Sequence, residues 1–487
     1  MKVPDILDGL VSLDRQASVP LGQQIYRAIR SAVGNGHFKP GMVLPSSRDL
    51  ANRLGVSRNT VNVAFELLQA ESIVTVGPGR ARIISDSAVL EGEGRSLPSA
   101  SGSAKLSARG ACLAADLRGD NWAFRHGALQ PGAPALDSFP HDLWGRFLRR
   151  AARRTSQPEL LYENATGHPE LTHVLSEYLA SERGVRAEPH QIIVTGSMQA
   201  SLSGLSQALA DPGNLAWIED PGYLGARTAF VGAGLSVHGM PVDHDGAVVD
   251  AMADHGSSPK LIYVTPSHSY PFGSRMTLAR RLKLLEVARE RGAIILEDDY
   301  DSEFLFEGRP IAALQGLAQA DEVIYLGTFS KSLLPGLRVS YCVVPDHLAD
   351  GLRRVFRQTG RLANVHAQIA LADFISSGEY RAHLKRIRQL YQVRGRALVQ
   401  ALKSRLGNAL FVEIPTGNVQ IAVRFRGALD DGLLAKKLQA RGFAVSPLSP
   451  CFLDRPVEPG LIIGFAAATS AQIEAFATAL SELLEGG

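Results

Sequence analysis

Cysteine is scarce in this sequence, whose 487 residues include only Cys112, Cys342 and Cys451. Three cysteines are an odd number and lie far apart, which argues against a disulfide framework and against a zinc cluster. Long apolar runs are also missing, since no stretch approaches the roughly 18 residues of a membrane span. The acidic Asp5 and Asp8 stand where a signal peptide would be apolar. We therefore expect a cytoplasmic protein with no membrane contact and no bound metal.

Charge is nearly balanced over the chain but unevenly distributed. The 51 Lys and Arg residues exceed the 48 Asp and Glu residues by three, whereas residues 1–84 alone hold ten basic and six acidic residues. Hydrophobic residues make up 45% and charged residues 20% of the chain, a balance typical of folded globular proteins. The length predicts roughly two to four domains, and the basic end predicts a phosphate-binding module attached to a near-neutral body.

The first eighty or so residues show the pattern of a winged helix-turn-helix. Apolar residues recur at every fourth position from Leu21 to Val33, which predicts a helix with one buried face. Ser57 is an expected N-cap, and Gly55 stands in the tight turn before it. The expected elements are helices at 21–33, 46–54 and 57–68, followed by a β-hairpin of strands at 73–76 and 81–84.

The second short helix of this pattern is the one expected in the major groove of DNA. Side chains at its start are donors and acceptors suited to base edges and phosphates. Arg48, which starts the preceding helix, and Arg80, in the hairpin, are placed to contact the DNA backbone or minor groove. The alternative is that these residues are solvated polar faces of a small helical domain. The candidate DNA-binding residues are Ser47, Arg48, Ser57, Arg58, Asn59, Thr60 and Arg80.

Residues 44–61 read Leu-Pro-Ser-Ser-Arg-Asp-Leu-Ala-Asn-Arg-Leu-Gly-Val-Ser-Arg-Asn-Thr-Val. This string closely resembles the GntR family of bacterial regulators, and the resemblance covers residues 14–84. It implies that this segment is a winged helix-turn-helix domain that binds double-stranded operator or promoter DNA.

The rest of the chain shows the pattern of an α/β fold. Residues 85–118 are rich in Ser, Ala and Gly without a sustained period, which predicts a flexible linker. Beyond them, strand-like apolar runs alternate with helical segments, so we expect a mainly parallel sheet in a domain at 119–487. A large subdomain is expected at about 165–345 and a smaller one at about 346–487. Examples of these runs lie at 191–194, 215–218, 261–264, 293–296 and 323–326.

Lys331 has the setting of a lysine that binds pyridoxal phosphate (PLP) as a Schiff base. It follows an apolar strand-like run, and Thr328, Ser330 and Arg338 offer two hydroxyls and a guanidinium to a phosphate. PLP also requires an acid at its ring nitrogen and a donor at its ring hydroxyl. Asp298 and Tyr300 are the candidates, because they emerge at the carboxyl end of a strand, where open α/β sheets place ligands.

Three further residues are weaker candidates when each is considered alone. Ser197 and Met198 stand in a turn that follows a strand and opens a helix, where backbone N–H groups face an anion. Tyr223 follows another strand and is suited to stack on the pyridine ring, although a core or surface tyrosine is nearly as common.

The acids at 297–301 have two alternative interpretations, a solvated loop or a metal site, and the metal site lacks suitably spaced histidines.

Four motifs carry a second resemblance: residues 219–223 (Glu-Asp-Pro-Gly-Tyr), 265–268 (Thr-Pro-Ser-His), 297–304 (Glu-Asp-Asp-Tyr-Asp-Ser-Glu-Phe) and 327–331 (Gly-Thr-Phe-Ser-Lys). In this order, behind a winged helix, they resemble the MocR subfamily of GntR-type regulators, whose second domain is similar to fold-type I aminotransferases. The resemblance implies a Schiff base at Lys331 and a head-to-tail homodimer, with Tyr162 reaching the partner's phosphate. It implies PLP contacts by Asp298, Tyr300, Ser197, Met198, Thr328 and Arg338.

The chain departs from the aminotransferase pattern near its C-terminus. Enzymes of this fold usually carry an arginine there that clamps the substrate carboxylate, whereas residues 460–465 read Gly-Leu-Ile-Ile-Gly-Phe. A smaller departure is Ser269, where glutamine is commoner. We therefore expect a PLP-dependent transcriptional regulator that senses PLP, or an amine or amino-acid effector, through Lys331. The alternative is an active PLP-dependent aminotransferase with an accessory DNA-binding domain.

Overall fold

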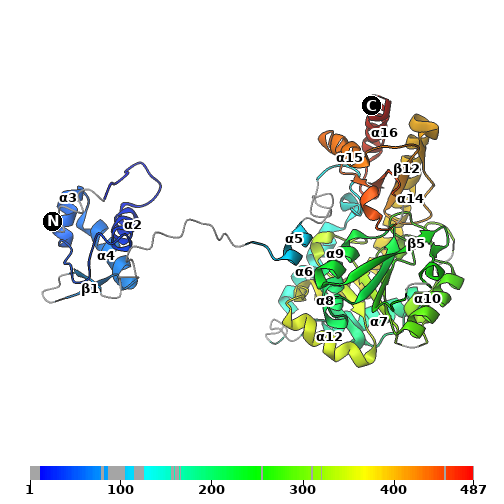
Figure 1. Ribbon diagram of the computed structural model, residues 1–487, viewed down its shortest axis with the longest axis horizontal. Coiled ribbons are helices and arrows are strands. Elements are labelled where there is room, and N and C mark those ends of the chain that lie inside the picture. Colours follow the sequence, from blue (N-terminus) through cyan, green and yellow to red (C-terminus); the bar gives the residue numbers. More distant parts are fainter. Residues whose placement is uncertain are drawn as a thin grey trace. The chain divides into compact units, whose positions relative to one another are not determined.

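The chain divides into two compact units, Met1–Lys105 and Leu106–Gly487 (Figure 1). The computed structural model describes residues 11–77, 82–85, 105–114, 126–154, 158, 164, 166–253, 256–308, 311–319, 321–454 and 457–485. Among these residues, no helix combines the length and the apolar character needed to cross a membrane.

The first unit is a three-helix domain with a short β-hairpin. Helices α2 (Leu21–Gly34), α3 (Ser47–Leu54) and α4 (Arg58–Ala70) precede β1 (Val74–Val76), which pairs antiparallel with β2 (Arg82–Ile84). Ser46 and Ser57 cap α3 and α4 through their hydroxyls, and Gly55 turns the chain between them at a φ of 62°. The expected helix-turn-helix layout is therefore present.

A single apolar core holds this unit together. Ile25 and Ile29 of α2, Phe65 and Leu68 of α4, and Leu50 of α3 are all buried in it. Ile25 and Ile29 are four residues apart, and Phe65 and Leu68 are three residues apart. This spacing turns one face of α2 and one face of α4 inward. The opposite face of α4 is free to present polar side chains to a ligand.

The second unit is built on an eight-stranded sheet in the order β3-β10-β9-β8-β7-β4-β5-β6. The five neighbouring strands from β9 to β5 are parallel, and β10 is antiparallel to both β9 and β3. The expected α/β class with a mainly parallel sheet is confirmed. The strands are β3 (Ile192–Thr195), β4 (Leu215–Asp220), β5 (Ser236–Asp243), β6 (Gly246–Ala247), β7 (Leu261–Val264), β8 (Ile294–Asp299), β9 (Val323–Thr328) and β10 (Ser340–Val343).

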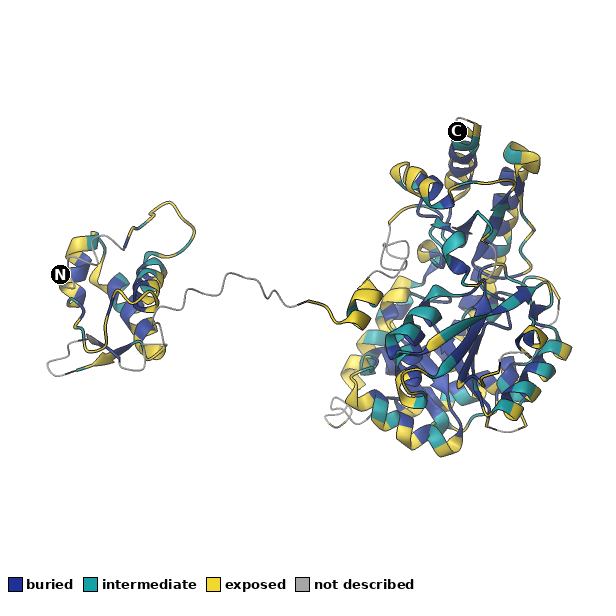
Figure 2. Cartoon of the chain, in the orientation of Figure 1, coloured by how far each residue is buried: buried dark blue, intermediate teal, exposed yellow. Residues whose placement is uncertain are grey.

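Helices cover both faces of this sheet, so its central strands are buried on both sides (Figure 2). In β7, Tyr263 packs in one core cluster with α8 and α9, while Ile262 packs in another with α10. This alternation explains why the strands read as continuous apolar runs in the sequence. The helices of this part of the unit are α6 (His141–Arg154), α7 (Pro169–Arg183), α8 (Met198–Leu209), α9 (Leu224–Ala233), α10 (Leu278–Arg291), α11 (Leu314–Leu317), α12 (Asp346–Gln358) and α13 (Val365–Ser376).

A smaller antiparallel sheet forms the C-terminal part of the unit, in the order β11-β12-β14-β13. Gly464, which ends β14, donates its N–H to the carbonyl of Leu129 at 2.9 Å, so the segment that precedes the large subdomain docks on this sheet. The elements are α14 (Glu379–Leu406), β11 (Leu410–Phe411), β12 (Gln420–Phe425), α15 (Asp431–Ala440), β13 (Ser446–Pro447), β14 (Gly460–Gly464) and α16 (Ser470–Glu485).

The expected flexible linker at 85–118 contains a helix. Helix α5 (Ala108–Ala114) lies against α9, since a Cβ added to Gly232 would be 3.3 Å from Cδ2 of Leu113. The composition of the segment did not indicate this helix, because its seven residues are too few to show a period. Residues 105–107 precede it and belong to the described part of the chain.

Candidate functional site

A cavity of about 500 Å³ lies at the carboxyl ends of the parallel strands. Asp298 and Thr328 line it from β8 and β9, and Tyr223 and Thr265 line it from the segments after β4 and β7. The other wall comes from the small sheet, through Gln420, Ser446 and Ile462 among others. The cavity therefore lies between the two subdomains, at the sheet edge where α/β folds bind ligands.

Asp298, which lines this cavity, has one buried carboxylate oxygen without a partner among the described residues. The hydroxyl of Tyr263 donates to Asp298 Oδ2 at 2.6 Å, whereas Asp298 Oδ1 has no hydrogen-bond partner among the described residues. Burial raises the pKa of Asp298 to about 7, and the negative charges of Asp299 and Asp301 act in the same direction, while the Tyr263 hydrogen bond opposes the shift. A buried acceptor without a donor is costly, so this oxygen suits a ligand N–H.

Lys331 meets a glycine across the cavity. Its Nζ donates to the carbonyl of Gly132 at 2.9 Å, and Gly132 has a φ of 72°. A Cβ on Gly132 would lie only 2.3 Å from Lys331 Nζ, so any larger residue would displace the amine. Sequence reasoning missed Gly132, which lies 199 residues from Lys331.

Tyr300 is held in a short chain of hydrogen bonds at the cavity wall. Its hydroxyl donates to the carbonyl of His268 at 3.1 Å and accepts from Asn418 Nδ2 at 3.1 Å. His268 Nδ1 in turn lies 2.8 Å from Asp301 Oδ1. Burial raises the pKa of Tyr300 well above its usual value, so this hydroxyl keeps its proton near neutral pH. Asn418 is a second residue that the sequence did not reveal.

Two hydroxyls and a helix start surround the remaining side of the cavity. Thr328 and Ser330 line it, and Thr328 Oγ1 accepts from the N–H of Ser330 at 3.2 Å. Met198, the first residue of α8, also lines it. Ser197 does not line the cavity, and its Oγ is the N-cap of α8, where it accepts from the N–H of Ala200 at 3.1 Å. The positive end of α8 is thus directed to the cavity.

Tyr223 lines the cavity with an aromatic face. Its ring lies over Gly225, where an added Cβ would be 2.4 Å from Tyr223 Cε1. The centroid of the Tyr223 ring lies 6.4 Å from that of Tyr263, with 30° between the two planes. The absence of a side chain at Gly225 therefore leaves room for the Tyr223 ring.

A further expected cofactor residue, Arg338, does not line the cavity. It is exposed and follows the 3-10 turn Pro335–Leu337 with a φ of 55°. Tyr162 lies outside the described residues.

Glu219 holds the loop that forms one side of the cavity. Its carboxylate accepts from the N–H of Thr265 at 3.0 Å and from the hydroxyls of Thr265 and Ser269. Burial raises the pKa of Glu219 to about 7, against these hydrogen bonds. Ser269, the residue that departs from the commoner glutamine, therefore has a structural partner.

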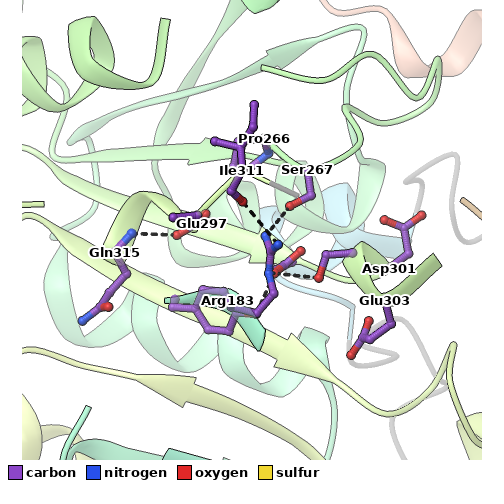
Figure 3. A network of polar contacts seen from close by, with 12 residues as sticks. Arg183, Pro266, Ser267, Glu297, Asp301, Glu303, Ile311 and Gln315 are labelled. Carbon is purple, nitrogen blue, oxygen red and sulfur yellow. Dashed lines mark hydrogen bonds and ion pairs between the residues drawn. The ribbon is translucent and has the colours of Figure 1, made fainter. Parts of the chain in front are cut away.

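The acids beside Asp298 form a separate network around Arg183 (Figure 3). Arg183 Nε donates to Asp299 Oδ2 at 2.7 Å, and its Nη2 donates to Ser267 Oγ at 2.8 Å. Burial alone would raise the pKa of Asp299, but the adjacent Arg183 charge and the hydrogen bonds outweigh it and lower that pKa. Glu297 accepts from two backbone N–H groups at the start of α11. Among the described residues these carboxylates form no group able to hold a metal ion.

In the first unit, the structure divides the expected DNA-binding residues into exposed and anchoring ones. Arg48, Arg58 and Asn59 are exposed, whereas Ser47 is buried and accepts a hydrogen bond from Arg58 Nε at 3.2 Å. Ser57 and Thr60 bond each other through their hydroxyls at 2.8 Å at the start of α4. Ser47 therefore orients Arg58 instead of facing solvent. Arg80 lies outside the described residues.

Family models match both units. The family described as "Bacterial regulatory proteins, gntR family" matches residues 21–84, and "Aminotransferase class I and II" matches residues 140–480. These matches define the class of protein, a transcriptional regulator whose DNA-binding domain is fused to an aminotransferase-like domain. Together with its similarity to whole regulators of the same architecture, they show that the chain belongs to the MocR subfamily of GntR-type transcriptional regulators.

Several regulators are similar over nearly the whole chain. "Probable rhizopine catabolism regulatory protein MocR" of Rhizobium meliloti is 39% identical over 94% of this chain and 92% of its own length. "HTH-type pyridoxine biosynthesis transcriptional regulator PdxR" of Corynebacterium glutamicum is 29% identical over 93% of this chain and 94% of its own length. The combination of the two domains is thus common to these regulators and to this chain.

Solved aminotransferases resemble the second unit. The kynurenine aminotransferase of Pyrococcus horikoshii, solved with PMP, is 25% identical with a TM-score of 0.69 and covers 74% of this chain and 91% of its own. LysN, the α-aminoadipate aminotransferase of Thermus thermophilus, was solved with a phosphopyridoxyl-leucine adduct. It is 25% identical, has a TM-score of 0.72 and covers 78% of this chain and 97% of its own. The second unit thus has the fold of PLP-dependent aminotransferases.

Proposed function

We propose that this regulator binds PLP at Lys331 and that the bound cofactor, alone or with an amine effector, alters its affinity for operator DNA. The observation that carries the proposal is the cavity that brings the Lys331 amine, the unpartnered Asp298 Oδ1 and the Tyr300 hydroxyl together. These are the three groups that the cofactor requires at its aldehyde, ring nitrogen and ring oxygen. PLP supplies an electrophilic aldehyde carbon and an electron-withdrawing ring when it is bound.

Each residue of the chain has a distinct part in this proposal. Lys331 provides the amine that attaches the cofactor, and Gly132 leaves room for that amine. Asp298 accepts the ring N–H and keeps the ring protonated, while Tyr263 orients the carboxylate. The α8 terminus at Ser197 and Met198, with Thr328 and Ser330, would receive the phosphate. Arg338 and the partner's Tyr162 are proposed to complete the phosphate site in a head-to-tail dimer.

The first unit would bind DNA through α4. Arg58, Asn59 and Thr60 at the start of the helix are proposed to contact base edges, with Arg48 and Arg80 on phosphates or in the minor groove. The Ser47 hydroxyl holds Arg58 Nε at 3.2 Å, which reduces the side-chain freedom lost on binding. An effector changes operator affinity only if it binds the two arrangements of the regulator unequally.

Aminotransferase activity is the second candidate, because the second unit resembles solved aminotransferases. Turnover requires a lysine that moves protons and a firm clamp on the substrate carboxylate. In this chain Ile462 lines the cavity in the strand where the clamp arginine was expected. The regulator is therefore the better-supported proposal.

A direct experiment separates the two candidates. The full chain is incubated with PLP, reduced with borohydride, digested and analysed by mass spectrometry, with Lys331→Ala as the control. We expect the reduced adduct on the Lys331 peptide and none in the variant, whereas labelling elsewhere would refute the assignment. Amino acids and a keto-acid acceptor are then added to unreduced protein, and release of keto acid over many turnovers would establish an enzyme instead of a sensor.

A further inference from the structure

We propose that the effector of the Lys331 cavity is a primary amine with an apolar body and no carboxylate beside the nitrogen. This inference rests on the proposed function and names the class of ligand that the same cavity selects. It follows from the side chains of the small sheet that face the cavity, and from the assignment to the cofactor of both charged residues, Lys331 and Asp298, that line it in the described part of the chain.

Ile462 faces the cavity from the middle of β14. It pairs with Ala422 of β12 and Ser446 of β13, and its side chain is 1% exposed. Its strand neighbours Leu461 and Ile463 point the other way and pack in the main core. Of these three successive residues, Ile462 alone therefore meets a ligand.

The surroundings of Ile462 are also apolar. It packs in a small cluster with Leu448, Cys451 and Phe452, and Tyr270 lies against that cluster. Cys451 and Tyr270 themselves line the cavity. Burial raises the pKa of the Cys451 thiol to about 12, so it is neutral near neutral pH and adds no charge to this wall. A carboxylate placed here would lose its hydration without gaining an ion pair.

The rest of the wall is neutral, with polar residues such as Ser446 and Gln130 among apolar ones. Gln420, from β12, offers a neutral amide close to Gly132, since a Cβ on Gly132 would be 3.9 Å from Gln420 Oε1. Among the described residues that line the cavity, Lys331 and Asp298 carry the formal charges, and both are assigned to the cofactor. The additional apolar lining residues are Pro131, Ala133, Pro134, Leu136, Leu224, Pro335, Pro447 and Pro450.

This wall predicts discrimination between an amine and the amino acid that differs from it by one carboxylate. Both molecules carry the same amine and the same apolar body, so burial of the body contributes equally to their binding. The amino acid must also desolvate its carboxylate against Ile462 and its apolar neighbours. We expect it to bind at least about tenfold more weakly than the amine.

Two matched pairs test this inference: 2-phenylethylamine against phenylalanine, and 3-methylbutylamine against leucine. The full chain is loaded with PLP, and each compound is titrated while the cofactor absorption spectrum and retention of promoter DNA are recorded. The amine of each pair is expected to change the spectrum at about tenfold lower concentration or less. Equal affinities, or tighter binding of either amino acid, would overturn the inference.

Ile462→Arg tests the same wall by adding a positive charge that can pair with a ligand carboxylate. An arginine here supplies a partner for the carboxylate, so the preference for the amine should fall about tenfold or reverse. Val457→Arg is the control, since Val457 is 59% exposed and does not line the cavity. An unchanged preference in an Ile462→Arg protein that still shows the bound-cofactor spectrum would overturn the inference. If that variant does not fold, the wild-type pairs still decide.

The two proposals fail in different ways. Absence of a PLP adduct at Lys331 in the wild-type chain rejects the proposed function itself. A normal adduct together with a preference for the amino acid rejects only the amine class of effector.

Discussion

Asp298→Asn gives the most specific test of the cofactor site. The asparagine has nearly the same size, but it has no negative charge, and its amide presents N–H donors as well as one oxygen. With Tyr263 donating to that oxygen, the amide N–H groups face the cavity in place of the unpartnered carboxylate oxygen. The substitution therefore removes the acceptor for a ring N–H without leaving a void.

The expected loss follows from the kind of hydrogen bond removed. A hydrogen bond to a charged group contributes about 1.5–3 kcal/mol, which corresponds to roughly 10-fold to 150-fold weaker binding of PLP. The assay is titration of the cofactor-free chain with PLP, followed by absorbance. Tyr263→Phe is the companion variant, expected to weaken PLP less, because it leaves the charge and removes only one neutral donor. PLP affinity unchanged in Asp298→Asn would refute the assignment of the ring nitrogen to this residue.

Three further predictions concern DNA binding, cavity shape and pH. Arg58→Ala is expected to abolish retention of promoter DNA in mobility-shift assays, whereas Arg405→Ala, at an exposed position on α14, leaves it intact; equal retention by both contradicts the assignment of α4. Gly132→Ala is expected to lower the yield of the reduced PLP adduct while secondary structure is kept, because the Lys331 amine must shift away from the new Cβ and a φ of 72° disfavours alanine. The folded pKa of Asp298, about 7, lies above its ordinary value, so the cofactor-free chain should lose stability as pH rises from about 4 to 7. The free energy of unfolding of Asp298→Asn, measured by calorimetry, should therefore rise relative to that of the wild type over this pH range, by at most about 4 kcal/mol. A difference between the two proteins that does not change with pH would contradict the raised pKa of Asp298.

Local sequence patterns predicted the helix-turn-helix elements, five strands of the large sheet and the polar residues that follow two of them. The caps Ser46 and Ser57 and the turn glycine Gly55 mark α3 and α4, because capping depends on neighbouring residues alone. Asp298 and Thr328 could be placed at one sheet edge, because parallel strands end on the same side. By contrast, β5 was missed, since Gly239 and Pro241 interrupt its apolar pattern.

Residues from distant parts of the chain could not be predicted in this way. Gly132 and Asn418 reach the site from outside the large sheet, and no spacing in the sequence connects them to Lys331 or Tyr300. The pairing of Arg183, at the end of α7, with Asp299, at the end of β8, spans 116 residues, so no local pattern indicates it. The burial of Ser47 also could not be predicted from local sequence. Its hydroxyl was expected to contact DNA, but it is buried and accepts a hydrogen bond from Arg58.

The central claim is that PLP at Lys331 controls DNA binding, and footprinting of the promoter beside the regulator's own gene tests it most directly. The full chain and Lys331→Ala are each titrated onto this DNA with and without PLP. We predict that PLP shifts the protein concentration for half-protection by the wild-type chain, or changes the protected bases, and has no effect on the variant. Identical footprints of the wild-type chain with and without PLP, at concentrations where the Lys331 adduct forms, would contradict the account.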